Sequence, residues 1–466
     1  MRYKEIAEHI IQDIRSSKLH IGAKMPSLRH MAKLQNVSMT TMLNSYHLLE
    51  ELGWIVAKPQ SGFYISRPLS DQSTPETPQF QSQIKSLSAN DYSGSCYQEF
   101  RQSGPLGISR IAPELMPTLM LQRSLKRSIS NFAEALHEYP ETQGNQRLRE
   151  VLSRHFSSHG FPILANDLVI TNGCINAIQF ALEATTKPGD SVAISSPCFS
   201  GLLELLALMD RKVIELPCTS EGIDLTQLEK HILQGNAQAG LFSTSHMNPQ
   251  GMSLSQEQKQ ALAELANKHQ FPVIEDDVYI ELSHSKNMPL PAKYWDKGGY
   301  ILWCSSVSKT LSPGFRVGWC IPGIYKDAMI KRVAVSQLGL NTPVQVGLAD
   351  FINTGQYQQH LNKLRTFLTL NVQEYIALLR QQLPENAAIS SPQGGTVLWL
   401  QIPGLHCKKL QKAAQENDLD IRIGASFTTL SLYQDCLRIN AGWPLDDKIR
   451  EKLNKLCELI RNHTAC

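Results

Sequence analysis

The sequence predicts two folded parts of different class: a small, mainly α-helical head with a short β wing, and a large α/β body that ends in a smaller α+β subdomain. Helical patterns and two short strand patterns fill residues 1–68, whereas Pro, Ser, Thr and Gln dominate residues 69–94. From there to residue 466, helical patterns alternate with short apolar strands. A chain of 466 residues is also too long for one ordinary core. We therefore expect a head at 1–68, a linker at 69–94 and a body at 95–466.

The composition is that of a globular protein without membrane segments. Hydrophobic residues make up 42% of the chain and charged residues 19%. The sequence contains no apolar run of about 18 residues, the length that spans a bilayer. The first residues alternate charged and apolar side chains at helical spacing, which is not the pattern of a signal peptide. We therefore expect a cytoplasmic protein.

Cysteine and charge patterns narrow the class further. The ten cysteines are scattered singly, with no CxxC pair and no His/Cys metal-ligand spacing, so we expect reduced thiols and no metal site. The net charge of +3 is unevenly placed, because residues 1–68 hold nine Lys and Arg against five Asp and Glu. This balance of +4 favours a phosphate-backbone partner, although a solvated charged helix face would give the same charge.

The head is expected to contain three helices. The isoleucines Ile6, Ile10 and Ile14 are spaced by four and predict a helix over residues 3–16. A second helix starts at Pro26 and Ser27, and its expected inward face is Leu28, Met31, Ala32 and Leu34. Ser38 is the expected N-cap of a third helix that Gly53 ends. The order is helix, turn, helix.

Two short strands, at residues 54–57 and 63–65, follow the third helix and form a wing. Gly62 in their connection, KPQSG, is free to take a positive φ. In this arrangement the second helix of the pair fits the major groove of B-DNA, while the wing lies over the backbone. Helix N-termini and short hydroxyl side chains suit phosphate contacts. The expected DNA contacts are Ser27, Arg29, Ser38, Thr40, Thr41, Gln60, Ser61 and Gly62.

Each of these residues also has a plain structural interpretation, since Ser38 and Thr40 suit helix caps and Arg29 suits a solvated surface. Taken together, however, the segment from Lys4 to Ile65 resembles the GntR-type winged helix-turn-helix, through its PSLR element, its VS-x-x-T helix start and its GFYI wing. The resemblance implies binding to double-stranded operator DNA. Met39 departs from the family, which often has a basic residue after the VS pair.

The body shows the pattern of an α/β fold. Its strand patterns are LVIT, SVAIS, AGLFST, FPVIED and ILWCSSV, and they alternate with helical patterns. This alternation predicts a parallel sheet covered by helices. From about residue 341, two long helical stretches precede three further strand patterns, TVLWLQI, IRIGAS and CLRINAG. We expect residues 341–466 to form the smaller subdomain.

Five short motifs follow one another in an order that suits a phosphorylated pyridine aldehyde. In TNGCINAI, Gly173 lets the backbone turn into a helix, where the N–H groups of Cys174 and Ile175 would meet a phosphate. Phe199 in SSPCFSG suits stacking on a flat ring, and Asn248 in HMNPQG suits a hydrogen bond to a ring oxygen. Each feature alone is also typical of an ordinary turn or a core aromatic.

The fourth and fifth motifs add the chemistry. VIEDDVY ends a buried strand at the sheet edge where α/β folds bind ligands; Asp276 there suits a protonated pyridine nitrogen, and Tyr279 suits the ring hydroxyl. A metal site is the alternative for paired aspartates, but no His or Cys lies nearby to complete it. In CSSVSKTLSPGFRVGW, Lys309 offers an amine for a Schiff base. Phosphate donors are expected from Ser306, Ser308 and Arg316.

Residues 95–466 resemble the fold-type I enzymes that use pyridoxal 5′-phosphate (PLP), the aspartate aminotransferase superfamily. The resemblance implies a Schiff base at Lys309, a pyridine-nitrogen contact from Asp276, contacts to the 3′ oxygen from Asn248 and Tyr279, and stacking by Phe199. It implies phosphate contacts from Gly173, Cys174, Ser306, Ser308 and Arg316. Cys174 and Ile175 replace the more usual Ser/Ala and Gln, but both still offer backbone N–H groups.

The same resemblance assigns two more residues. Arg438 in CLRIN matches the arginine that binds an amino-acid carboxylate, for which its planar fork is suited. Tyr139 in YPETQGNQRLRE matches the tyrosine that reaches the phosphate of the neighbouring subunit, so a homodimer is implied.

A GntR-type head on an aminotransferase-like body resembles the MocR subfamily of transcriptional regulators. This implies that PLP or a small amino compound, bound at Lys309, acts as effector of DNA binding. Two alternatives stay open: an active aminotransferase with an appended DNA-binding domain, and a DNA-tethered protein whose cofactor site is inactive.

Overall fold

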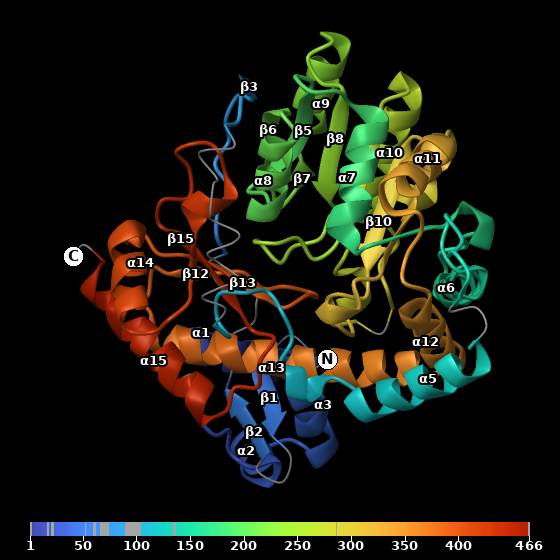
Figure 1. The fold of residues 1–466 in the computed structure, drawn as a ribbon. Helices are drawn as coiled ribbons and strands as arrows, with labels where there is room; N and C mark the ends of the chain where they lie inside the picture. The colour runs from blue at the N-terminus through green and yellow to red at the C-terminus, as the bar shows by residue number, and fades with distance from the viewer. Residues whose placement is uncertain are drawn as a thin grey trace. The chain divides into compact units, whose positions relative to one another are not determined.

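The computed structural model describes residues 2–15, 18–19, 23–51, 53–58, 62–65, 74–88, 104–133, 137–285 and 287–464. The chain divides into two compact units, Met1–Thr74 and Pro75–Cys466 (Figure 1). The first unit contains the head and the second contains the body.

The head consists of three helices followed by a two-stranded antiparallel wing. Its elements are α1 (Arg2–Arg15), α2 (Leu28–Leu34), α3 (Met39–Glu51), β1 (Ile55–Lys58) and β2 (Gly62–Ile65). The four isoleucines of α1 are buried, and they pack with Met42, Tyr46 and Leu49 of α3 in one apolar core. The helix-turn-helix and wing predicted from the sequence are confirmed.

Local contacts explain where the helices of the head begin and end. The side chain of Ser27 accepts a hydrogen bond from the backbone N–H of His30, and that of Ser38 accepts one from Thr41 at 3.1 Å. Gly53 and Gly62 have φ values of 77° and 98°, which favour glycine. One expectation was wrong: Leu34 is 65% exposed, because α2 ends at this residue and no further helical turn covers its side chain.

The body contains a large sheet with the strand order β3-β6-β5-β8-β9-β10-β11-β4, and β7 pairs with β6. The bounds are β3 (Ile84–Lys85), β4 (Val169–Thr171), β5 (Ser191–Ser196), β6 (Lys212–Thr219), β7 (Gly222–Ile223), β8 (Ala239–Ser243), β9 (Val273–Asp276), β10 (Ile301–Ser306) and β11 (Gly318–Ile321). Neighbouring strands from β6 to β10 are parallel, but β11 is antiparallel to both β10 and β4.

The prediction of a parallel sheet therefore needs a correction, since the sheet is mixed. Residues 307–317 join β10 to β11 without the crossover helix that a parallel connection requires, so the chain returns antiparallel to β10. This return is important for the site, because it carries the chain from Lys309 to Arg316 and back to the sheet.

Helices cover both faces of the large sheet (Figure 1). Ile194, Leu241 and Ile274 point to a core shared with α7, α8 and α11, whereas their neighbours Ala193 and Phe242 point to a core shared with α9 and α10. The helices of this part are α5 (Thr118–Asn131), α6 (Gln146–Ser158), α7 (Cys174–Thr185), α8 (Ser200–Leu208), α9 (Leu225–Leu233), α10 (Gln256–His269), α11 (Lys326–Gln337), α12 (Thr342–Asn353) and α13 (Gln356–Gln382).

The smaller subdomain is an antiparallel sheet with two helices, which confirms the expected α+β class. The two helical stretches expected at its start, however, are α12 and α13, and α12 and the first turns of α13 pack in the core that contains Leu148 and Trp303. The sheet has the order β12-β13-β15-β14, and it places Trp399, Arg438 and Arg422 opposite one another on neighbouring strands. The elements are β12 (Ala388–Ile389), β13 (Val397–Gln401), β14 (Arg422–Ile423), β15 (Cys436–Asn440), α14 (Cys407–Glu416) and α15 (Asp447–Asn462). Short 3₁₀ turns lie at Pro113–Leu115, Ala165–Asp167, Ile280–Leu282, Ala292–Trp295, Pro313–Phe315, Gly323–Tyr325 and Gly424–Phe427.

Part of the segment expected as a linker is built into the second unit. Strand β3 pairs with the outer side of β6, and the backbone N–H of Glu76 donates to Gln401 Oε1 at 3.0 Å. The backbone N–H and the hydroxyl of Ser82 both donate to Gln227 Oε1, at 2.8 and 2.7 Å. Residues 75–88 therefore contact the large sheet, α9 and the smaller subdomain.

Within the described residues, no helix is long and apolar enough to cross a membrane, and no three His, Cys, Asp or Glu side chains are grouped as metal ligands. The eight cysteines in this part of the chain are buried and form no disulfide.

Candidate functional site

Lys309 lies in the turn that follows β10. Its amine donates a hydrogen bond to the backbone oxygen of Ser109 at 2.6 Å and lies 5.4 Å from the centre of the Tyr279 ring. The next residue, Thr310, holds the turn in place, because its hydroxyl bonds the Tyr357 hydroxyl at 2.8 Å and its backbone oxygen contacts His360 at 2.7 Å. The amine is thus half-buried on a turn anchored to α13.

Three hydroxyl groups form a chain beside this amine. The hydroxyl of Tyr279 lies 2.6 Å from that of Ser109, which lies 3.1 Å from that of Thr396. All three residues are buried. Tyr279 was expected here from the sequence, whereas Ser109 and Thr396 were not. Ser109 lies 200 residues before Lys309 in a segment with no helical or strand pattern, so only the folded chain brings them together.

Asp276 is the last residue of β9 and is buried. Burial raises its pKa to about 6, while a hydrogen bond from the thiol of Cys174, at 3.4 Å between Sγ and Oδ1, and the charge of Lys309 oppose the rise. The thiol is a contact that the sequence did not indicate, because Cys174 was expected to act only through its backbone N–H. The site therefore contains one buried acid near one amine.

The neighbouring Asp277 points to the other side of the strand, as successive residues do. Its Oδ2 accepts a hydrogen bond from the indole of Trp303 at 3.1 Å. Because the two carboxylates diverge, they do not form the paired-aspartate metal site considered as an alternative.

A small cradle forms where β4 leads into α7. Gly173 precedes this helix with a φ of 85°, and a Cβ atom there would lie 2.4 Å from Nη2 of Arg316. The same Nη2 donates to Asn172 O at 2.9 Å, and Nη1 lies 3.5 Å from the hydroxyl of Ser308. Arg316 itself has a φ of 50°, so the β10–β11 connection turns its guanidinium toward the start of α7.

Ser306 and Ile175 complete the set expected around the phosphate. Ser306 is buried, and its hydroxyl accepts the backbone N–H of Ser308 at 3.2 Å. The side chain of Ile175 is 40% exposed on the first turn of α7. The structure thus brings Gly173, Cys174, Ser306, Ser308 and Arg316 together at one helix N-terminus, where free N–H groups and the helix dipole favour an anion.

Asn248 and Arg438 meet on the side of the smaller subdomain. Nη1 of Arg438 donates to Asn248 Oδ1 at 2.9 Å, Nη2 donates to the backbone oxygen of Gly107, and the guanidinium lies 5.1 Å from the centre of the Phe427 ring. Both residues are buried. Phe199 precedes α8 and packs in the apolar cluster that contains Cys174.

Tyr139 is not brought to these residues within the chain. It is 87% exposed. Its expected target is the phosphate of a second subunit, and that assignment stays a prediction.

The expected DNA contacts lie on the surface of the head. Ser27, Arg29, Ser38, Thr40 and Gly62 are exposed, and Thr41 is half-buried with its hydroxyl 2.8 Å from that of Ser38. Gln60 and Ser61 lie outside the described residues. Ser27 and Ser38 also cap helices, so the two interpretations of these residues are compatible.

Residues 2–65 match the family of bacterial regulatory proteins called the gntR family, and residues 83–456 match aminotransferase class I and II. The chain belongs to the HTH-type transcriptional regulators that join a GntR domain to an aminotransferase-like domain.

Relatives of this regulator share both of its parts or its body alone. The HTH-type transcriptional regulator YdcR of Escherichia coli (strain K12) is 32% identical over 466 residues, which cover 99% of both chains. The aromatic-amino-acid aminotransferase 1 of Thermococcus litoralis is 25% identical over 75% of this chain and 86% of its own length. The crystal structure of the multiple substrate aminotransferase of Thermococcus profundus covers 79% of this chain and 95% of its own, with a TM-score of 0.73 and 22% identity, which shows the fold.

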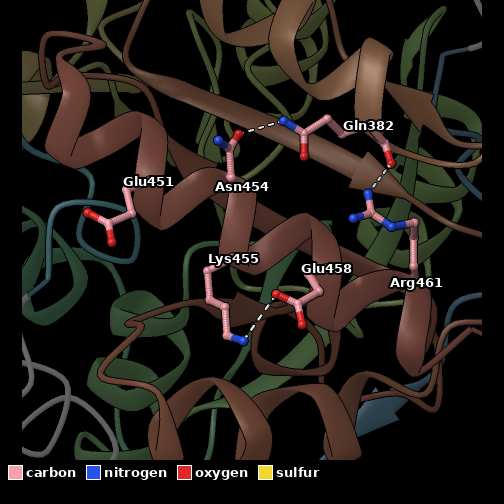
Figure 2. A pocket seen from close by; sticks show the side chains of 6 residues that line it. All are labelled: Gln382, Glu451, Asn454, Lys455, Glu458 and Arg461. Atoms are coloured by element: carbon pink, nitrogen blue, oxygen red, sulfur yellow. Dashed lines mark hydrogen bonds and ion pairs between the residues drawn. The ribbon is translucent and has the colours of Figure 1, made fainter.

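A separate hollow lies on the surface of the regulator's smaller subdomain (Figure 2). It is formed by α15 with the end of α13, and its lining includes Gln382, Asn454 and Arg461. These side chains already bond one another or backbone, as with Gln382 Nε2 and Asn454 Oδ1 at 2.5 Å. None of the residues around Lys309 lines it, so we do not assign a ligand to it.

Proposed function

We propose that this transcriptional regulator binds PLP at Lys309 and that the bound PLP, or a small amino compound that reacts with it, changes the affinity of the head for operator DNA. The observation that carries the proposal is the position of the Lys309 amine between Tyr279 and Ser109, in the same site as a buried acid and a guanidinium cradle. A head that binds DNA and a body that binds a metabolite give such a protein two coupled sites.

The residues of the body fit PLP. Gly173 leaves space beside Arg316 that any other side chain would fill, since its Cβ would lie 2.4 Å from Nη2. The N–H groups of α7 and the guanidinium together suit a phosphate dianion. At the other end of the site, Asp276 supplies the carboxylate expected for a pyridine nitrogen, and a pKa of about 6 leaves it ionised at neutral pH.

Bound PLP would supply an aldehyde that forms a Schiff base with amines. The chain supplies positioning around this chemistry: Ser109 O holds the amine of Lys309, and the hydroxyl of Tyr279 is oriented by that of Ser109. We assign Asn248 to the 3′ oxygen and Phe199 to the face of the ring. Arg438 is assigned to the carboxylate of an amino-acid effector, because it is a buried guanidinium beside Asn248.

We further propose a homodimer in which Tyr139 reaches the partner's phosphate site. Tyr139, Leu338 and Ile175 are 87%, 65% and 40% exposed. Gly339 packs against Pro140, and Gln337 Nε2 donates to Asn176 Oδ1 at 3.1 Å, so these apolar side chains belong to neighbouring segments. Exposed apolar patches of this kind are typical of interfaces. Sedimentation of the purified chain is expected to show a dimer.

Covalent trapping tests the cofactor assignment. Purified protein is mixed with PLP, followed by absorbance, reduced with borohydride and digested for mass spectrometry. The adduct is expected on the peptide that contains Lys309 and is expected to be absent from Lys309→Ala, while Lys326→Ala, a substitution on α11, keeps it. An unmodified Lys309 at saturating PLP would refute the site.

DNA binding tests the regulatory assignment. Operator affinity is measured with the same protein without PLP, with PLP, and with PLP plus a panel of amino acids and amines. Since a ligand shifts a conformational equilibrium only through different affinities for two states, at least one condition must change the dissociation constant. Equal affinities throughout would contradict the proposal even if PLP binds.

An active aminotransferase is the second candidate. The buried Arg438 and the similarity to an enzyme named aromatic-amino-acid aminotransferase favour it. Steady conversion of amino acid and 2-oxo acid pairs would support catalysis, whereas a spectral change that stops after one equivalent would support sensing. We place the protein in the cytoplasm because its GntR domain acts on DNA.

A further inference from the structure

The exposed side of α3 has a composition that indicates which base pairs it reads. We propose that Met39 and Leu43 contact the 5-methyl group of thymine in the major groove, and that Asn44 bonds the adenine of an A·T pair next to it. The proposal rests on the DNA-binding role of the head and adds a sequence preference to it.

The two sides of α3 differ sharply. Met42, Tyr46 and Leu49 are 0% exposed and belong to the core of the head. The hydroxyl of Tyr46 donates to Pro26 O at 2.8 Å, and that of Ser45 donates to Tyr3 O at 3.0 Å. This side of the helix is therefore committed to the fold and is not available for DNA.

The opposite side is exposed over its first two turns. Met39 and Leu43 are 46% and 37% exposed and lie four residues apart, so their side chains are neighbours along the helix. Thr40 and Asn44, also exposed and four residues apart, form the adjacent row. Two apolar side chains at these positions do not serve the core, and leaving them in water has no benefit for stability.

The charge of the sequence segment that contains this face favours nucleic acid as the partner. Residues 14–49, which include α2 and most of α3, contain five Lys and Arg and no Asp or Glu. The carboxylates of the head lie instead on α1 and at the end of α3, at Glu5, Glu8, Asp13, Glu50 and Glu51. A protein partner of opposite charge would not need the groove-sized helix and wing that the head provides, whereas duplex DNA fits both features.

The chemistry of the side chains then selects the bases. Thymine is the base of unmodified DNA that presents a methyl group in the major groove, and apolar side chains are its usual contacts. Asparagine matches the N6 and N7 atoms of adenine with two hydrogen bonds. A basic side chain at position 39 would instead favour guanine or a phosphate. The exposed row of α3 therefore predicts a half-site whose centre contains A·T pairs.

The proposed base contacts are tested by selecting the preferred DNA site and then removing single methyl groups from it. The full chain selects duplexes from a random library, and each thymine of the recovered site is then replaced by uracil, which removes only the methyl group. At one or two positions, uracil is expected to weaken binding roughly three- to fivefold, the effect of about one buried methyl group. Binding is measured by fluorescence anisotropy at fixed salt.

The variants Met39→Ala and Leu43→Ala connect the effect to these side chains. Each is expected to bind the thymine site more weakly than the unchanged protein does. Each is also expected to bind the uracil and thymine duplexes with equal affinity. Asn44→Ala is expected to lose the preference for adenine. Leu208→Ala, which removes a 74% exposed leucine of α8 in the body, is the matched control and should retain the wild-type response.

The outcomes distinguish a failure of the DNA-binding role from a failure of the proposed base contacts. If no sequence is enriched, the DNA-binding role fails. If a site is enriched but no uracil substitution weakens binding, or if both methionine and leucine variants still distinguish uracil from thymine, the head binds DNA and the proposed readout is wrong.

Discussion

The exposed face of α3 and the Lys309 site differ in how the fold holds the side chains that we propose as ligand contacts. On α3 the expected contacts are exposed, and several of them, such as Thr40 and Asn44, project from a helix that its other side holds in place. In the body, several of the expected contacts are buried and already hydrogen-bonded, as Arg438 is to Asn248 and Tyr279 is to Ser109, while Arg316 is exposed. Changes on the exposed face of α3 should therefore affect DNA affinity and leave stability nearly unchanged, whereas changes in the body should affect both ligand affinity and stability.

The largest loss of stability is expected from Glu281→Ala, in the hydrogen-bond network next to the turn that carries Lys309. Burial alone would raise the pKa of Glu281, but His155, Tyr357 and Arg365 together hold it below its usual value. Its oxygens bond His155 at 2.6 Å and Tyr357 at 2.7 Å, and the latter bonds Thr310. Removing one partner of a buried ionic contact should lower the free energy of unfolding by roughly 3–5 kcal/mol.

Denaturant unfolding of Glu281→Ala measures the loss, and PLP absorbance at saturating cofactor reports whether the turn at Lys309 is also disturbed. A stability close to that of the unchanged protein would show that the network is not coupled to the fold.

Asp276→Asn, in contrast, should increase the free energy of unfolding. Because burial raises the folded-state pKa of Asp276 from 3.8 to about 6, the ionised form is disfavoured in the folded protein. The free-energy cost of burying the carboxylate is fully present above the folded-state pKa. It disappears as the pH falls below the pKa of the unfolded state. The variant should therefore stabilise the PLP-free protein at pH 8 by about 1–3 kcal/mol, since one pKa unit corresponds to about 1.4 kcal/mol, and the gain should fall by about half at pH 5.

The same substitution should weaken PLP binding, because the amide cannot balance a protonated pyridine nitrogen. Thermal or denaturant unfolding at several pH values and a PLP titration give the two readouts. A gain in stability that does not depend on pH would mean that the carboxylate is not the source of the penalty.

A pair of glycine variants separates backbone strain from the cradle at α7. Gly173 and Gly189 have φ values of 85° and 86°, but a Cβ on Gly173 would meet Arg316, whereas a Cβ on Gly189 would meet no atom within 4 Å beyond its chain neighbours. Alanine at either position should cost roughly 1–3 kcal/mol of stability, because residues other than glycine rarely adopt such a positive φ. Gly173→Ala alone should also reduce PLP affinity roughly 10-fold or more, because this is the loss in affinity that follows from removing one hydrogen bond to a charged group.

Equilibrium titration with PLP distinguishes the two glycine variants. Equal affinities would show that the space beside Arg316 is not used by the phosphate.

The smallest effects are expected for substitutions in the head, where they distinguish residues that stabilise the fold from residues that contact DNA. Ser38→Ala removes the N-cap of α3 and should cost about 1 kcal/mol of stability. Thr40→Ala should leave the stability of the head within about 0.5 kcal/mol and weaken DNA binding only. Circular dichroism melting and anisotropy on the selected operator provide the measurements. A large loss of stability in Thr40→Ala would mean that this residue belongs to the fold.

The sequence predicted most of the elements because their patterns are local. The caps at Ser27 and Ser38, the glycines at 53 and 62 and the buried isoleucines of α1 follow from rules that act within a few residues. Strand β11 was not expected, because Gly318–Ile321 is only four residues long and follows a loop rich in turn residues. Strand β3, which is also antiparallel to its neighbour, lies in the segment expected as a linker. Because neither strand was expected, the predicted sheet was parallel throughout.

The site was predictable where chemistry depends on residue type and not where it depends on distant contacts. Lys309, Asp276 and Arg316 lie in motifs whose order along the chain carries the prediction. Ser109 and Thr396 are a serine and a threonine in segments without a motif, and only the tertiary fold places them beside Tyr279. The thiol of Cys174 was overlooked because its backbone alone accounted for its place in the phosphate set.

The pairing of β3 with β6 has a practical consequence for separating the two units of the chain. A fragment that starts at residue 95 would lack β3 together with the bonds from Glu76 and Ser82, and it would uncover the backbone groups of Val213 and Ile214 on an outer strand. Uncovered strand edges of this kind promote intermolecular pairing. Limited proteolysis and fragment design should therefore cut between residues 66 and 74, so that the aminotransferase-like body keeps its protective strand and stays monodisperse.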